Sequence, residues 1–541
     1  MTTMEILTIA LLVCFFAVMI GVGVFTRSRA TDVNGFVLGG RSVGPWLTAF
    51  AFGTSYFSAV IFVGYAGQFG WNFGLSSTWA GLGNAFIGSL LAWNILGRRT
   101  RVMTQHYDSK TMPDYFGKRF DSKGLKIAAS IIVFIFLIPY TASLYNGLSS
   151  LFGLVFSIPY WVVIAIMAVL TGVYVIFGGY MATAINDFIQ GIIMLFGIAA
   201  VIIAVVASKG GLVEAMKSLS AIEGDAGWAG AYSSFLGPDP LALLFVVILT
   251  SLGTWGLPQM VGKFYAIKSE KDIHKGTIIS TFFAIVVAGG CYFLGGFGRL
   301  FDNDGLYQIL EDGSRGKLFF DRIVPSMLSS LPGIIIAIVI VLVLSASMST
   351  LSSLVLTSSS TFTLDVIKPA SKKGMSDKKQ VFIMRLFIVF FIAVSAIIAV
   401  VKDSIPGLTF IAQMMGVSWG ALAGAFLAPF LYSLYSKKVT KASAAVCFIW
   451  GCGIAVFQMI VSLVPSINAS DFGPFFGYIF KSSINSGVVA MVGGLFIVPI
   501  VSAFTKKPDA KIVDDAFASY ERTITVKVSE SLGDEEEAEE K

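Results

Sequence analysis

Apolar stretches long enough to cross a lipid bilayer recur along nearly the whole chain, and they restrict its fold more than any other feature. A membrane-crossing helix, here called a span, needs roughly 20 mainly apolar residues. The sequence predicts about thirteen spans, near residues 4–26, 44–69, 74–97, 126–152, 160–178, 184–207, 239–263, 276–299, 325–363, 380–401, 406–436, 441–464 and 485–505. Because lipid offers the backbone no hydrogen bonds, these segments should be helical. We therefore expect an all-α polytopic membrane protein.

The composition agrees with this fold class and excludes several others. Hydrophobic residues make up 56% of the 541 residues and charged residues only 13%, which is unlike a soluble protein. The Lys and Arg residues lie in short loops and form no basic stripe with aromatic residues, so no nucleic-acid partner is expected. The cysteines all lie inside apolar stretches, so neither a disulfide framework nor a thiolate metal site is expected: Cys14, Cys291, Cys447 and Cys452.

The distribution of basic residues orients the chain in the membrane. Lys and Arg are dense after the first, third, seventh, ninth and eleventh spans, and Lys263 is grouped with the loop after the seventh. Loops of this kind stay on the cytoplasmic side. With an odd number of spans, the N-terminus lies outside and the C-terminus lies in the cytoplasm. We expect a multi-pass protein of the plasma membrane.

Two spans contain Gly and Pro where a membrane helix should be regular. The breaks run from Gly53 to Ala59 and from Gly253 to Pro258. If each begins a half of five helices, the halves form a 5+5 inverted repeat with a binding site between the breaks. The expected parts are an extra N-terminal helix with a cytoplasmic loop, two repeats, two further helices and a disordered acidic cytoplasmic tail: residues 1–43, 44–207, 239–436, 437–505 and 506–541.

The ninth span ends in an unusually dense run of hydroxyl residues between Leu344 and Thr361. At helical spacing, Ala346, Ser349, Thr350 and Ser353 share one face. Such a face can supply the oxygen ligands that a small hard cation prefers. Alternatively, each hydroxyl bonds to a carbonyl of its own helix or links two helices.

Several motifs resemble the sodium:solute symporter family. They are Phe36–Pro45, Thr111–Phe120, Phe177–Gln190, the Ser349-Thr350-Leu-Ser352-Ser353 run and Trp419–Gly424, and the resemblance covers roughly residues 5–465. The N-terminal half looks most like the branch of bacterial sodium/proline symporters. The resemblance implies a leucine-transporter fold with one extra helix in front, which agrees with the repeat read from the breaks.

The resemblance also implies a main sodium site between the first break and the serine-rich helix. Its ligands by position are the carbonyl groups of Thr54, Phe57 and Ala346, together with the hydroxyl groups of Ser349 and Thr350. Sodium is then the coupling ion of the transporter.

Some members of the family hold a second sodium, and the matching positions here are Asp187, Ser349, Ser352 and Ser353. A carboxylate beside an apolar stretch is costly, which also favours an ion pathway at Asp187. Alternatively, Asp187 caps the N-terminus of the sixth span. The proline branch usually has an acidic residue where this chain has Tyr56, which weakens the expectation of proline as the solute.

Five residues are candidates for binding the solute: Ser58, Tyr140, Trp255, Gln259 and Gln413. Aromatic rings can shape an apolar pocket while a few polar groups orient the ligand. The alternatives are ordinary helix packing for the aromatic residues and interhelical hydrogen bonds for the glutamines. No Arg or Lys is expected at the depth of this site.

These observations predict a sodium-coupled symporter that imports a small organic solute by alternating access. The solute is an amino acid such as proline, or alternatively a monocarboxylate or a sugar. Coupling to protons instead of sodium stays open, as does a membrane sensor that acts through a separate partner. No catalytic motif was found, so no enzyme is expected. The expected partners are the solute, sodium and the lipid bilayer, and the sequence makes no prediction about oligomeric state.

Overall fold

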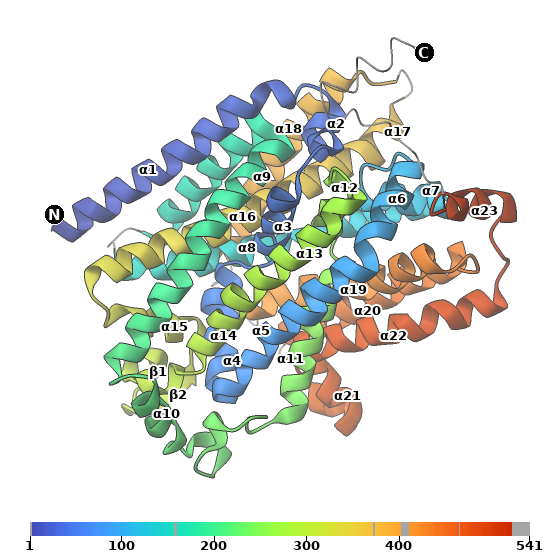
Figure 1. Cartoon of the computed structure of the whole chain (residues 1–541). Coiled ribbons are helices and arrows are strands. Elements are labelled where there is room, and N and C mark those ends of the chain that lie inside the picture. The colour runs from blue at the N-terminus through green and yellow to red at the C-terminus, as the bar shows by residue number, and fades with distance from the viewer. Residues whose placement is uncertain (1–2, 156–158, 372–373, 402–410, 465, 522–541) are drawn as a thin grey trace, which may run out of the picture.

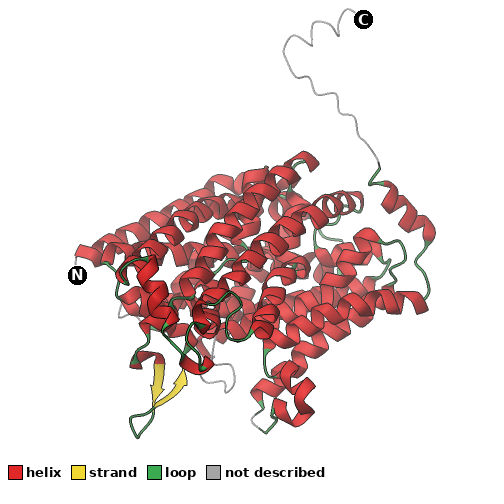
Figure 2. Ribbon diagram, turned by 60° about the horizontal axis from the view of Figure 1, so that its bottom comes forward, coloured by secondary structure: helices red, strands yellow, loops and turns green. Residues whose placement is uncertain are grey.

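The computed structural model describes the chain except residues 1–2, 156–158, 372–373, 402–410, 465 and 522–541. Long helices dominate it, and one small antiparallel hairpin joins strands β1 (Tyr307–Ile309) and β2 (Arg315–Leu318) at one end of the bundle (Figure 1 and Figure 2). The prediction of a nearly all-helical protein is therefore confirmed.

The α-helices are α1 Thr3–Thr26, α2 Val33–Leu38, α3 Pro45–Thr54, α4 Ala66–Phe73, α5 Thr78–Gly83, α6 Arg98–His106, α7 Met112–Arg119, α8 Lys123–Val155, α9 Tyr160–Ser208, α10 Leu212–Ser220, α11 Pro240–Leu252, α12 Pro258–Ala266, α13 Glu270–Ala284, α14 Gly290–Gly295, α15 Ile323–Ser329, α16 Gly333–Phe362, α17 Lys368–Ala370, α18 Asp377–Val401, α19 Ile411–Tyr435, α20 Lys441–Leu463, α21 Gly473–Phe480, α22 Ser483–Phe504 and α23 Ala510–Ala518. Turns of π-helix extend several of them, at Val60–Tyr65, Asn84–Leu91, Trp93–Gly97, Ile285–Gly289 and Thr363–Ile367.

Among the described residues, 10 helices are long and apolar enough to cross a membrane, or up to 11 if α11 and α12 form one bent span. Two predicted spans, 160–178 and 184–207, lie within the single helix α9, which kinks at Gly179. This glycine has φ 54°, and a Cβ atom there would lie 2.8 Å from the carbonyl oxygen of Phe36. Only glycine fits such a position without strain. The count of thirteen spans and the 5+5 repeat stay predictions.

Helices α16 and α19 form the interior of the bundle. In the most apolar part of α19, 94% of the residues are buried, against 22% for α1. Helix α16 packs against α8, α9 and α18, while α19 packs against α8, α20 and α22 (Figure 1). The serine-rich segment therefore lies inside the protein and faces other helices rather than lipid.

Polar residues at the helix starts explain several of the boundaries. The Thr111 hydroxyl accepts a hydrogen bond from the backbone N–H of Asp114 at the start of α7, and Asp239 and Ser269 cap α11 and α13 in the same way. Such caps satisfy backbone donors that have no partner inside the helix. Proline at the first or second helical position further marks the starts of α7 and α11.

The basic segments that the charge pattern assigned to one side of the membrane do lie together. Arg41 donates to the carbonyl of Ser109, and Arg101 donates to the carbonyl of Lys268. Arg99 donates to the carbonyl of Leu434. The loops after the first, third and seventh spans therefore share one end of the bundle, and its assignment to the cytoplasm stays a prediction.

The first part of the C-terminal tail is helical, contrary to the expected disorder of residues 506–541. Helix α23 buries Val513 and Ala516, and the Tyr520 hydroxyl donates to the carbonyl of Leu434. The apolar positions of α23 recur at helical spacing. The prediction of disorder rested on the acidic residues further along the tail and overlooked this pattern. Residues 522–541, with their run of glutamates, lie outside the described residues.

Candidate functional site

The first predicted break is present and interrupts the helix inside the protein. Helix α3 ends at Thr54, the chain is not helical from Ser55 to Ser58, and a π-helical turn resumes at Val60. The second break is also present. A short 3-10 turn, Gly253–Gly256, follows α11, Leu257 is extended, and α12 leaves at 46°. Both breaks expose backbone carbonyl groups that an unbroken helix would use internally.

The structure brings together all five residues predicted for the main sodium site. The Ser349 hydroxyl oxygen lies 3.2 Å from the Thr54 carbonyl oxygen and 3.1 Å from that of Ala346. The Thr350 hydroxyl oxygen lies 3.0 Å from the Thr54 oxygen, 3.2 Å from that of Phe57 and 3.1 Å from that of Ala346. All five residues have 0% exposure. We call this set the oxygen cluster.

The two hydroxyl groups of the oxygen cluster make five contacts with carbonyl oxygens but carry only two hydrogens, because each hydroxyl has a single O–H. Ala346 lies within the regular helix α16, where its carbonyl oxygen also accepts a backbone N–H. The Thr350 hydroxyl cannot donate to its three neighbouring carbonyls at once. A small cation would satisfy all five oxygens together. Since none of the five groups is a carboxylate, the cluster suits a singly charged ion better than a divalent one.

Asp187 is completely buried and lies inside α9, far from either end of that helix. It is therefore not the helix cap that the sequence left open as an alternative. Its carboxylate faces Lys263 of α12, with 3.7 Å between Oδ2 and Nζ. This distance makes an ion pair but is too long for a hydrogen bond.

The grouping of Lys263 with a surface loop was wrong, and so was the expectation that no basic residue lies near the site. The side chain is 4% exposed, and its ammonium group donates to the Ser353 hydroxyl at 3.0 Å. The spacing from the second break could have shown this. Five residues of helix after Pro258 rise only about 7.5 Å, whereas half of the hydrocarbon layer is about 15 Å. A lysine this close to a break inside the membrane stays buried.

The four positions predicted for a second sodium do not face one common point but bond to other groups. Ser349 belongs to the oxygen cluster, and the Ser352 hydroxyl donates to the carbonyl of Ser349 in its own helix at 2.9 Å. Ser353 lies 2.9 Å from the Ser55 hydroxyl in the first break and accepts from Lys263. Lys263 thus bridges Asp187 and Ser353.

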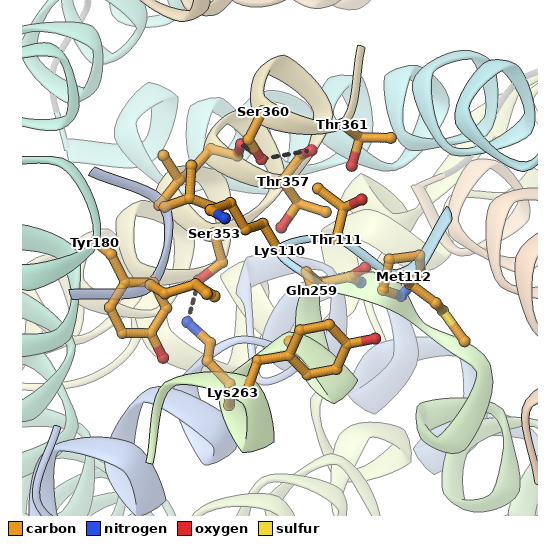
Figure 3. Close-up of a pocket in the computed structure, with 16 residues that line it drawn as sticks. Lys110, Thr111, Met112, Tyr180, Gln259, Lys263, Ser353, Thr357, Ser360 and Thr361 are labelled. Carbon is orange, nitrogen blue, oxygen red and sulfur yellow. Dashed lines mark hydrogen bonds between the residues drawn. The ribbon is translucent and has the colours of Figure 1, made fainter. Parts of the chain in front are cut away.

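A small cavity lies beside Lys263 and is also lined by Lys110, a residue of the basic segment after the third span (Figure 3). Its volume of about 40 Å³ is enough for a few water molecules. The labelled side chains come from four parts of the chain: Lys110, Thr111, Met112, Tyr180, Gln259, Lys263, Ser353, Thr357, Ser360 and Thr361. Among the described residues, neither side-chain polar atom of Gln259 has a hydrogen-bond partner, although the residue is 2% exposed.

The five predicted solute-binding residues do not all line the cavity beside Lys263. Gln259 lines the cavity of Figure 3, and the other four do not. Ser58 accepts from the backbone N–H of Val60, and the Tyr140 ring meets that of Trp419 edge to face at 6.1 Å. Trp255 donates to the carbonyl of Ile87 at 3.0 Å.

Gln413 is 8% exposed near the start of α19. Additional buried polar groups that the sequence reasoning missed lie near the first break or on neighbouring helices. Within the described part of the chain, the hydroxyl groups of Tyr56 and Tyr65 have no hydrogen-bond partner, and the Tyr292 hydroxyl faces the amide of Asn84.

The comparisons with known proteins agree on one family. The model of the sodium:solute symporter family matches residues 36–451. The osmoregulated proline transporter OpuE of Bacillus subtilis is 28% identical over 497 residues, which cover 91% of this chain and 94% of the relative. A sodium/proline symporter of Staphylococcus aureus is 30% identical over 527 residues and 94% of each protein.

Among solved structures, the chain resembles a Na+-coupled sialic acid symporter in a substrate-bound outward-open state. The TM-score is 0.71 at 18% sequence identity, over 93% of this chain and 98% of that protein. At this identity the likeness concerns the fold, which is that of the leucine-transporter class.

Proposed function

Because the chain belongs to the sodium:solute symporter family, and is thus a multi-pass membrane transporter and not an enzyme, we propose that it imports a small organic solute together with sodium. The oxygen cluster is the observation that carries the proposal. It unites the predicted ligands from two segments that lie about 290 residues apart in the chain. Its five residues are fully buried, and their oxygens are of the kind that a small hard cation prefers.

Sodium in the oxygen cluster would join the first break to α16 and so link ion binding to the conformation of the transporter. Thr54 and Phe57 belong to the break, whereas Ser349 and Thr350 belong to α16. Sodium therefore favours the conformation in which the two segments are together. Because coupling between two binding sites is reciprocal, a solute that prefers this conformation tightens sodium binding by the same factor.

For the solute, we propose an amino acid such as proline, bound beside the first break. Ser58 directly follows the cluster residue Phe57, and the Tyr140 and Trp419 rings offer an apolar wall. Two relatives are named as proline transporters, which supports this choice over a monocarboxylate or a sugar. Trp255, Gln259 and Gln413 are the further candidates for solute contact.

Uptake of labelled proline into proteoliposomes tests the proposal. An inward sodium gradient should drive accumulation, while potassium in place of sodium, or a sodium ionophore, should abolish it. Unlabelled monocarboxylates and sugars added in excess identify the solute class by competition. Uptake that follows a proton gradient and ignores sodium would contradict sodium coupling. Solute binding without any transport would favour the sensor.

A further inference from the structure

Lys263 lies where the family resemblance places a second sodium. Its ammonium group is 3.0 Å from the Ser353 hydroxyl and 3.7 Å from the Asp187 carboxylate, and all three side chains are buried. The dashed line from Lys263 in Figure 3 marks its bond to Ser353, and the Tyr180 ring lies 5.2 Å from the ammonium group. A positive charge attached to the chain thus already occupies this position.

At the predicted position of the second sodium, the charge of Lys263 alone balances that of Asp187. Asp187 supplies one negative charge and Lys263 one positive charge. Lys110, which also lines the cavity, pairs instead with Asp108 at 3.0 Å. A sodium ion beside Asp187 would add a second positive charge within a few ångströms of the ammonium group, and two like charges in a poorly solvated site repel strongly.

The two candidate cation positions differ in the positive charge that the chain supplies. None of the five residues of the oxygen cluster carries a charged side chain. The position beside Asp187 receives an ammonium group with three N–H donors. In addition, the Ser352 hydroxyl points to the carbonyl of its own helix, so this set of ligands is not assembled.

We propose that Lys263 acts as a tethered cation that takes the place of a second sodium and limits the transporter to one sodium ion per cycle. The inference rests on the proposed sodium coupling at the oxygen cluster. Removing the ammonium group would leave the Asp187 carboxylate buried without its counter-ion, next to Ser353 and a water-sized cavity. Those oxygens would then bind sodium.

Binding of radioactive sodium to the purified full-length protein at fixed pH tests this. The wild type should bind one sodium ion per chain, and Lys263→Ala should bind two. Lys263→Arg is the matched control: it keeps the positive charge and should stay at one. The double variant Lys263→Ala/Asp187→Asn removes both charges and should return to one, because the carboxylate that attracts the second ion is gone.

The outcomes separate this inference from the proposed function. Two sodium ions on the wild type, or only one on a folded Lys263→Ala protein, would overturn the role of Lys263. If Lys263→Ala does not fold, Lys263→Met, which keeps a side chain of similar length without the charge, should bind two sodium ions, and one ion on that folded protein would equally overturn the role. Adding Thr350→Val should weaken binding of one sodium ion in every protein. If the wild type binds no sodium at all, the proposed function fails instead.

Discussion

Thr350 provides the sharpest test of the oxygen cluster, because its hydroxyl touches three of the other four groups. Thr350→Val keeps the side-chain shape and removes only the hydroxyl. Thr54 and Ala346 would still face the Ser349 hydroxyl, whereas the Phe57 carbonyl would lose the donor described here. Leaving one buried acceptor unsatisfied should destabilise the sodium-free protein by about 1–3 kcal/mol.

The loss of one oxygen ligand should weaken sodium binding more specifically. A contact between a polar group and a charge contributes about 1.5–3 kcal/mol, and each 1.4 kcal/mol changes affinity about tenfold. Thr350→Val should therefore raise the sodium concentration for half-maximal uptake by about 10- to 150-fold. The maximal rate at saturating sodium should change much less.

Thermal unfolding with and without sodium gives an independent measure. At a sodium concentration of about 100 times the wild-type Kd, binding stabilises the protein by about 2.7 kcal/mol. A variant with a 100-fold weaker site keeps only about 0.4 kcal/mol of this effect.

Ser359→Ala is the matched control, since its buried hydroxyl bonds to Leu356 of the same helix. It should leave the sodium response unchanged. A folded Thr350→Val protein with wild-type sodium dependence would refute the assignment of the oxygen cluster.

Two further predictions concern stability. Gly179→Ala should lower the melting temperature through strain of roughly 1–3 kcal/mol, because residue 179 has φ 54° and the new Cβ would meet Phe36. The control Gly172→Ala in the same helix should lower it less. Equal melting temperatures for the two variants would argue against a strained kink at residue 179. Burial alone would raise the pKa of Asp114, but the ammonium groups of Lys126 and Lys118 outweigh it and hold that pKa below the usual 3.8. The stabilisation from Asp114 is therefore present above about pH 4 and is lost as the pH falls through the lowered pKa. Melting curves of wild type and Asp114→Asn should converge on acidification; a constant difference would contradict the ion pair.

Much of the site could be predicted because it depends on local chemistry. Glycine and proline inside apolar stretches indicated both breaks, and the run of hydroxyl residues indicated the face of α16 that meets the first break. The motif positions then singled out Thr54 and Phe57. These features could be recognised because a membrane penalises any interruption of a helix and any polar side chain. Each exception in the sequence therefore points to a place where the protein interior compensates that cost.

Other features depended on contacts between distant segments. The sequence placed Lys263 with the basic loops by its type and neighbours, but the bend after Leu257 carries it to Asp187 and Ser353. The solute-binding candidates were chosen one by one; of these, Gln259 lines the cavity beside Lys263, whereas Trp255 bonds to Ile87.

The sequence by itself determined that the chain is a bundle of membrane helices, where two of them break, and which helix presents hydroxyl oxygens. These properties follow from the cost of polar groups in lipid, which acts on each segment separately. Only the tertiary structure decided which oxygens share one cluster and which charge faces Asp187. Those pairings depend on distances of a few ångströms between helices far apart in the chain, and no local pattern encodes such distances.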